Sequence, residues 1–143
     1  MKPKLLLRLA SVIILLHALG HTMGVYTWKK PASHVPQELV KQMVDQRFQF
    51  MGADRSMAEF YDGFGYASTI ALLLIVFLLW IISGLTEKNP GVSVKILLPV
   101  LIFLVLFGLD ELIFFFPFAT ALTIVSALLT LLAIISLKKP SHQ

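Results

Sequence analysis

Residues 94–137 read VKILLPVLIFLVLFGLDELIFFFPFATALTIVSALLTLLAIISL, and this run of 44 residues decides the fold. A hydrocarbon core about 30 Å thick needs about 20 apolar residues per helix, so the run is long enough to cross it twice. Pro117 divides the run, because proline lacks the amide hydrogen and clashes with the preceding helical turn. The sequence therefore predicts two spans, at residues 94–116 and 118–137, joined by a tight turn.

Two further apolar segments, residues 5–23 and 64–85, are also long enough to span. With 57% hydrophobic and 14% charged residues, the chain is too apolar for a soluble domain of its length. We therefore predict an all-α fold in which residues 1–143 form a single membrane domain, a bundle of four transmembrane helices. We expect membrane lipids as partners and no nucleic acid, because the basic residues flank the apolar segments. Cofactors and oligomeric state stay open.

The distribution of basic residues predicts the orientation. The N-terminus, the loop at 86–95 and the C-terminus, with Lys138 and Lys139, carry seven Lys or Arg residues, and Glu87 is the only acid among them. Basic residues concentrate on the cytoplasmic side of membrane proteins, so we expect both termini in the cytoplasm of a cell-membrane protein. An alternative takes residues 1–20 as a signal peptide, but His17 interrupts the apolar region that such a peptide needs.

Residues 25–62 are then expected outside the cell, between the first two spans. Val40, Met43, Val44, Phe48 and Met51 recur at spacings of three and four, which predicts an amphipathic helix within residues 36–51 that ends near Gly52. Next, Ser56-Met57-Ala58-Glu59 fits a capping box, in which the serine and glutamate side chains satisfy each other's backbone amides. The second long helix should therefore begin near Ser56.

Two histidines and two acids lie inside the predicted spans: His17 and His21 in the first, Asp110 and Glu111 in the third. An aspartate at a helix centre costs about 2.5–3.5 kcal/mol on insertion scales, so such groups are usually paired or functional. A rise of about 1.5 Å per residue places all four groups in the outer half of the membrane. We expect them to line one cavity there and treat all four as candidate catalytic residues.

The segment from Asp54 to Gly65 is expected to cover this cavity, and the candidate ligand-binding residues are Arg55, Tyr61, Asp62 and Trp28. Histidine titrates near neutral pH, so a histidine beside a carboxylate is suited to moving a proton to or from an apolar substrate. The preferred interpretation is a site that binds or converts a lipid-like small molecule. The substrate, and whether the protein is an enzyme, stay open.

Two alternatives to this interpretation remain. His17 and His21, one helical turn apart, could bind a metal together with the acids, although no His-Glu-x-x-His run is present. Alternatively, the chain is a non-catalytic structural or accessory subunit, in which a buried histidine–carboxylate pair only fixes the helix pairing.

Four motifs in the first half of the chain are notable: His17-x-x-Gly20-His21, Phe48-Gln-Phe-Met-Gly52, Arg55-Ser56 and Phe60-Tyr61-Asp62-Gly63-Phe64-Gly65. In these motifs the chain resembles a family of small bacterial four-helix membrane proteins of unassigned function. The likeness spans residues 5–85, and the acidic third helix is a looser match. It implies a four-span bundle in a bacterial inner membrane and little about chemistry. The architecture is also similar to the sterol-isomerase type of membrane fold, in which intramembrane histidine and acidic groups line a lipid pocket.

Overall fold

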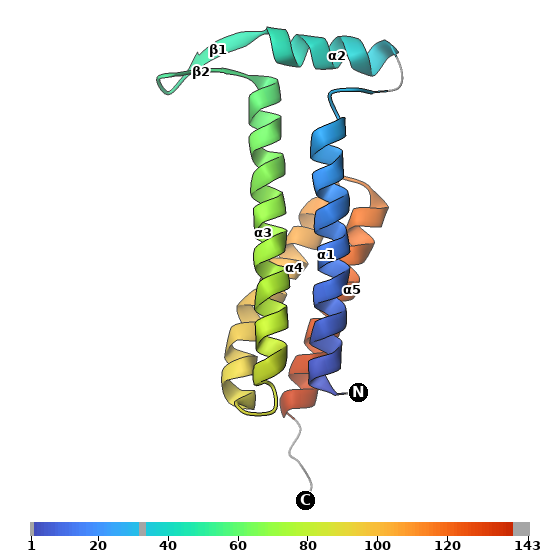
Figure 1. The fold of residues 1–143 in the computed structure, drawn as a ribbon, viewed down its shortest axis with the longest axis vertical. Coiled ribbons are helices and arrows are strands. Elements are labelled where there is room, and N and C mark those ends of the chain that lie inside the picture. Colours follow the sequence, from blue (N-terminus) through green and yellow to red (C-terminus); the bar gives the residue numbers. More distant parts are fainter. Residues whose placement is uncertain (1, 32–33, 139–143) are drawn as a thin grey trace, which may run out of the picture. The chain divides into compact units, whose positions relative to one another are not determined.

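The computed structural model describes residues 2–31 and 34–138, so Lys139, used above to predict the orientation, lies outside the described residues. The elements in chain order are α1 (Pro3–Thr27), α2 (His34–Asp45), β1 (Arg47–Phe50), β2 (Ala53–Ser56), α3 (Met57–Leu85), α4 (Pro90–Phe114) and α5 (Pro117–Lys138) (Figure 1). Of the helices within the described ranges, α1, α3, α4 and α5 are long and apolar enough to cross a membrane. The structure is mostly helical, although its two-stranded sheet departs from the predicted all-α fold, and the four apolar helices are consistent with a multi-pass membrane protein.

The chain forms two compact units, and α1 and α3 contribute residues to both. The first unit combines residues 1–17 with 72–143, and the second consists of residues 18–71. The first therefore contains all of α4 and α5, whereas the second contains α2 and both strands.

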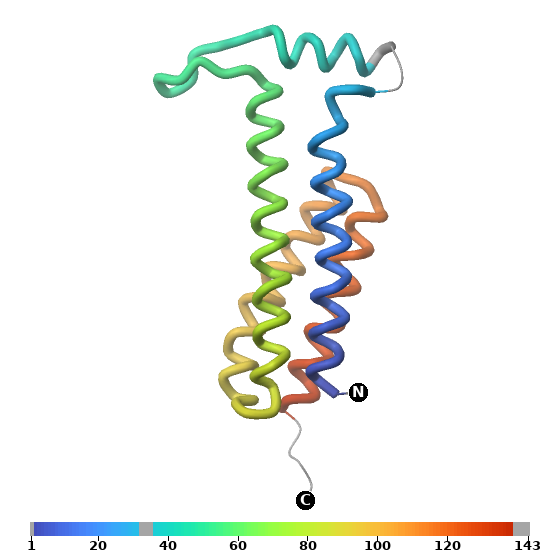
Figure 2. Tube along the Cα trace, in the orientation of Figure 1, coloured from blue at the N-terminus to red at the C-terminus, as the bar shows by residue number. Residues whose placement is uncertain are grey.

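In the first unit, α4 and α5 are antiparallel neighbours joined by a tight connection (Figure 2). The predicted break at Pro117 is confirmed, with Pro117 as the first residue of α5, where its missing amide hydrogen costs nothing. α4 ends at Phe114 rather than at the predicted residue 116. Gly108 permits close packing, since a Cβ there would lie 2.8 Å from Ile124 Cδ1. The residues that α5 buries are mostly small: Ala119, Thr120, Thr123, Ser126, Ala127, Thr130, Ala133 and Ile134.

The N-terminal part of α1 joins this unit through polar as well as apolar contacts. Ser11 Oγ donates to Val76 O at 2.9 Å, which ties α1 to α3. The guanidinium of Arg8 lies 4.9 Å from the ring centroid of Trp80, a cation–π contact. Leu7, Ala10 and Ile14 are fully buried beside these contacts, so one face of α1 lies in the core of the first unit.

In the second unit, the capping box predicted at the start of α3 is confirmed. Ser56 N donates to Glu59 Oε2 at 2.7 Å, and Glu59 N donates to Ser56 Oγ at 3.3 Å. The two side chains thus satisfy backbone amides that the first helical turn leaves without partners. α3 begins at Met57, as the sequence predicted.

The predicted helix over residues 36–51 is wrong in its extent. α2 ends at Asp45, and residues 47–56 form an antiparallel hairpin, so the fold is not purely α-helical. Met51 and Gly52 make the turn with φ of 49° and 83°, the left-handed conformation of a two-residue hairpin loop. Phe48 and Phe50 share one face of β1 and contact Phe60, with ring centroids 5.9 and 5.7 Å away. These aromatic contacts favour the period of a strand over helical spacing.

Candidate functional site

His17 and Glu111 form a buried polar contact in the first unit. His17 Nε2 lies 3.0 Å from Glu111 Oε1, and each side chain is only 5% exposed. The other ring nitrogen, Nδ1, lies 3.1 Å from Thr123 Oγ1, and Thr123 has no exposed surface. Both nitrogens of the imidazole are therefore engaged, which fixes the ring and joins α1 to α4 and α5. The close approach of α5 at Gly108, one turn from Glu111, places Thr123 within reach.

Two buried oxygen atoms beside this network have no hydrogen-bond partner among the described residues: Glu111 Oε2 and Thr120 Oγ1. Gly108 lies against Thr123 across the α4–α5 pair, and Glu111 and Thr120 each lie three residues nearer to the connection. In an antiparallel pair this places Glu111 and Thr120 opposite each other. A buried polar atom without a partner is costly, so this end of the first unit has unused hydrogen-bonding capacity.

The other two candidate catalytic residues make different contacts. His21 Nε2 lies 3.1 Å from Gly65 O in the second unit. Asp110 is exposed, whereas its neighbour Glu111 is buried, as expected for adjacent helical residues about 100° apart. The structure thus brings His17 and Glu111 together, and a single cavity lined by all four residues stays a prediction.

Three of the four candidate ligand-binding residues form one cluster in the second unit. Trp28 Nε1 donates to Asp62 Oδ1 at 2.9 Å, and Lys29 Nζ forms an ion pair with Asp62 Oδ2. The rings of Trp28 and Tyr61 lie 4.5 Å apart. Nearby, a Cβ on Gly65 would lie 2.7 Å from Val25 Cγ2, so this glycine permits the close packing. The Asp62 carboxylate is therefore used to hold the end of α1 against α3.

The hairpin separates its charged side chains onto two faces. Arg47 and Asp54 are diagonal neighbours on one face, and Arg47 Nε donates to Asp54 Oδ2 at 2.9 Å. Arg47 Nη2 also lies 3.4 Å from Glu59 Oε2. The hydrogen bond to Asp54 is the main cause that raises the pKa of Arg47 above its usual value. Arg47 therefore interacts with both nearby carboxylates.

Arg55, the fourth candidate ligand-binding residue, is on the opposite face, directly across from Phe48. Its Nη1 donates to Asp54 O at 2.9 Å. Within the described part of the chain, Arg55 forms no ion pair with a carboxylate. A guanidinium has five N–H donors, so most of this binding capacity is available at the start of α3.

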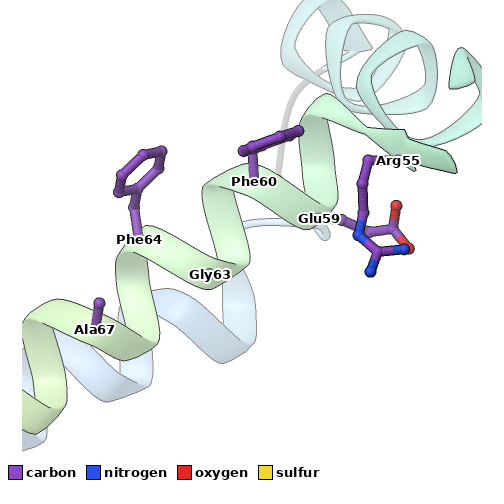
Figure 3. A pocket seen from close by; sticks show the side chains of 6 residues that line it. All are labelled: Arg55, Glu59, Phe60, Gly63, Phe64 and Ala67. Atoms are coloured by element: carbon purple, nitrogen blue, oxygen red, sulfur yellow. The ribbon is translucent and has the colours of Figure 1, made fainter. Parts of the chain in front are cut away.

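Arg55 is at one end of an open groove on α3, which we call the α3 groove. It has a volume of about 290 Å³ and is lined by Arg55, Glu59, Phe60, Gly63, Phe64 and Ala67. Figure 3 shows Phe60, Phe64 and Ala67 projecting from the same side of the helix. Gly63 and Ala67 have little or no side chain, so they leave space beside the two aromatic rings. The lining is apolar apart from its two charged residues, Arg55 and Glu59.

The sequence interpretation did not identify the α3 groove or Thr123. The spacing of Phe60, Phe64 and Ala67, at i, i+4 and i+7, does place an aromatic and small-residue column on one helical face. Likewise, the connection at residues 115 and 116, directly before Pro117, makes residues equally distant from it face each other, which pairs the 108–111 segment with 120–123. These two signals were present in the sequence, but neither by itself indicates a ligand.

The metal-binding alternative receives no support from the geometry. Over residues 2–31 and 34–138, no group of three or more His, Cys, Asp or Glu side chains is placed to hold a metal ion. His17 and His21, the proposed ligands, instead contact Glu111 and Gly65 O, respectively.

No family model matches this sequence, and neither a curated protein nor a solved structure matches it. The resemblance to small bacterial membrane proteins therefore depends on the quoted motifs alone. The four apolar helices are consistent with a membrane-protein family, and the chemistry has to be argued from the site itself.

Proposed function

We propose that this multi-pass membrane protein binds a lipid-like amphiphile in the α3 groove. The observation that carries the proposal is an apolar groove whose two charged residues, Arg55 and Glu59, lie at one end, on a helix suited to a membrane. Ligand pockets usually enclose about 300–1,000 Å³ and combine an apolar lining with a few polar groups. At about 290 Å³, the groove is at the lower limit of this range, which suits one hydrocarbon chain rather than a bulky ring system.

The position of the groove also favours an amphiphile over a fully apolar ligand. The residues from Glu59 to Ala67 extend about 12 Å along α3 at the usual helical rise. Arg55 and Glu59 come first along the chain, so both charged residues are at one end and the aromatic walls follow them. A ligand with a polar head and an apolar chain matches this order of side chains.

Labelling with a photoactivatable lipid tests the proposal. The full-length protein would be reconstituted with a phospholipid that carries a diazirine on one acyl chain, irradiated, and digested for mass spectrometry. We expect adducts to concentrate on residues 60–67 rather than on exposed apolar residues elsewhere on α3, such as Phe77 and Ile81. An even distribution of adducts over these surfaces would contradict the proposal.

Two glycine variants provide a matched comparison. Gly63→Leu places a side chain in the groove, and the backbone tolerates it, because an added Cβ meets no atom within 4 Å. Gly84→Leu makes the same change on the same helix, at another glycine with no atom within 4 Å, but outside the groove. We expect Gly63→Leu to reduce the adducts on residues 60–67 several-fold and Gly84→Leu to leave them unchanged. If both variants label as the wild type does, the ligand does not occupy the groove.

A second candidate function is conversion of the ligand by proton transfer, with His17 and Glu111 as the proton-carrying pair. The observation in its favour is the unused hydrogen-bonding capacity of Glu111 Oε2 and Thr120 Oγ1. Against it, His17, Glu111 and Thr123 are buried, so a substrate has no direct access to them. We therefore favour binding over catalysis. Conversion of a bound lipid that Glu111→Gln abolishes and Asp110→Asn preserves would reverse this preference.

A further inference from the structure

We propose that the ligand of the α3 groove is an anionic phospholipid of the surrounding bilayer, whose headgroup pairs with Arg55. This inference depends on the proposed function, because it identifies the chemical class of the same ligand. The two faces of the hairpin differ in the partners of their charged side chains.

Arg47 and Arg55 differ in their partners, although they are only eight residues apart. Arg47 forms ion pairs with Asp54 and Glu59 on its own face of the hairpin. Glu59 Oε2 also accepts a hydrogen bond from Ser56 N in the capping box. Both carboxylates therefore already have partners, and Glu59, although it lines the groove, forms no ion pair with Arg55 among the described residues.

Arg55 uses one hydrogen bond to fix its position and retains the others for a ligand. Its Nη1 donates to the backbone oxygen of Asp54, which is uncharged and leaves the positive charge without a counter-ion among the described residues. Phosphate oxygens fit the fork of N–H groups on a guanidinium in a bidentate geometry. An anionic headgroup therefore matches Arg55 in charge and in hydrogen-bond direction.

The apolar remainder of the groove favours a ligand whose headgroup carries a hydrocarbon chain. Arg55 shares its face of the hairpin with Phe48, whose ring stacks on that of Phe60. Phe60 and Phe64 then form the wall along which the groove continues. A soluble anion would leave this aromatic surface exposed, whereas one acyl chain of a phospholipid would cover it. A membrane lipid thus accounts for both ends of the groove.

Lipid selectivity measured by native mass spectrometry tests this inference. The full-length protein would be equilibrated in mixed micelles containing equal amounts of dioleoyl phosphatidylglycerol, which is anionic, and dioleoyl phosphatidylcholine, which is zwitterionic. We expect the wild type to retain the anionic lipid preferentially. Arg55→Gln should reduce this preference about three- to tenfold, as expected for loss of a partly exposed charge-assisted hydrogen bond. Arg55→Lys should retain part of the preference, because it keeps the charge but not the fork.

Lys41→Gln is the matched control, since it removes one positive charge from an exposed position on α2 in the same unit. Lys41 does not line the groove. An equal loss of preference in Lys41→Gln and Arg55→Gln would mean that net charge alone attracts the lipid, and it would overturn the inference. Unchanged preference in Arg55→Gln would do the same.

The outcomes separate this inference from the proposed function. If Gly63→Leu prevents labelling of the groove while Arg55→Gln keeps its lipid preference, the groove binds an amphiphile but Arg55 does not select it. If Gly63→Leu has no effect, the proposed function itself fails. Competition by millimolar inorganic phosphate against lipid binding would identify a free anion as the ligand of Arg55 and would contradict a lipid source.

Discussion

His17 Nε2 and Glu111 Oε1 are 3.0 Å apart, and both side chains are almost completely buried in the first unit. The contact joins a residue of α1 to a residue of α4 that is 94 positions later in the sequence. Thr123 Oγ1 forms a hydrogen bond with the second ring nitrogen, Nδ1, so the imidazole connects three helices. The contribution of this contact to the free energy of unfolding therefore depends on whether one partner or both are removed.

The single and double leucine substitutions of His17 and Glu111 should change the free energy of unfolding by different amounts. His17→Leu or Glu111→Leu alone should lower the free energy of unfolding by about 3 kcal/mol, because the remaining polar group stays buried without its partner. The double variant should lose much less, since an apolar pair of similar volume is often neutral. Thermal unfolding in detergent, followed by circular dichroism, measures both. If the double variant loses as much free energy of unfolding as the two single variants together, the two side chains do not interact.

Two threonines on α5 provide a second comparison, because only one has a hydrogen-bond partner. Thr123→Val should lower the free energy of unfolding by about 1–3 kcal/mol, since it leaves His17 Nδ1 without a partner. Thr120→Val should be neutral or stabilising by up to about 1 kcal/mol, because it removes a buried hydroxyl that has no partner in the described part of the chain. The same thermal unfolding experiment serves for both. A large loss in Thr120→Val would mean that this hydroxyl has a partner.

Glycine-to-alanine substitutions should distinguish a glycine in a close helix contact from a glycine on an open helix surface. In Gly65→Ala the new Cβ would lie 2.7 Å from Val25 Cγ2, and a β-branched side chain in a helix has little freedom to move. We expect a loss of about 1–3 kcal/mol for this variant. Gly20→Ala is the control, since no atom lies within 4 Å of its added Cβ, and it should gain up to about 1 kcal/mol from helix propensity. The reverse order of stability would contradict the packing described here.

The predicted orientation can be tested with single cysteines, because the chain has none of its own. The excess of basic residues at the chain ends predicts that Lys138 lies in the cytoplasm and that Gln42, on α2, lies outside the cell. In intact cells, a membrane-impermeant maleimide should therefore label Gln42→Cys, and it should label Lys138→Cys only after the cells are permeabilised. Labelling of Lys138→Cys alone in intact cells would show that the orientation is inverted.

The sequence by itself determined the four long apolar helices of this protein, α1, α3, α4 and α5. The apolar run at 94–137 and its interruption by Pro117 predicted α4 and α5, and the Ser56–Glu59 capping box predicted the start of α3. These features are local: hydrophobic length, the missing proline amide hydrogen and helix capping act within a few residues. The burial cost of ionisable groups also indicated that His17 and Glu111 needed partners, although it did not select them.

Tertiary structure decided the hairpin and the distribution of the site residues. The apolar residues at 47–51 also fit a helical spacing. A strand, however, places Phe48 and Phe50 on one face, where both contact Phe60, and this contact favours the strand. Similarly, the sequence treats His17 and His21 alike, yet one contacts Glu111 and Thr123 and the other contacts Gly65 O. The space left by Gly108 and Gly65 determines which backbones come close, and thus which polar groups meet. Such contacts depend on residues far apart in the chain, so no local pattern specifies them.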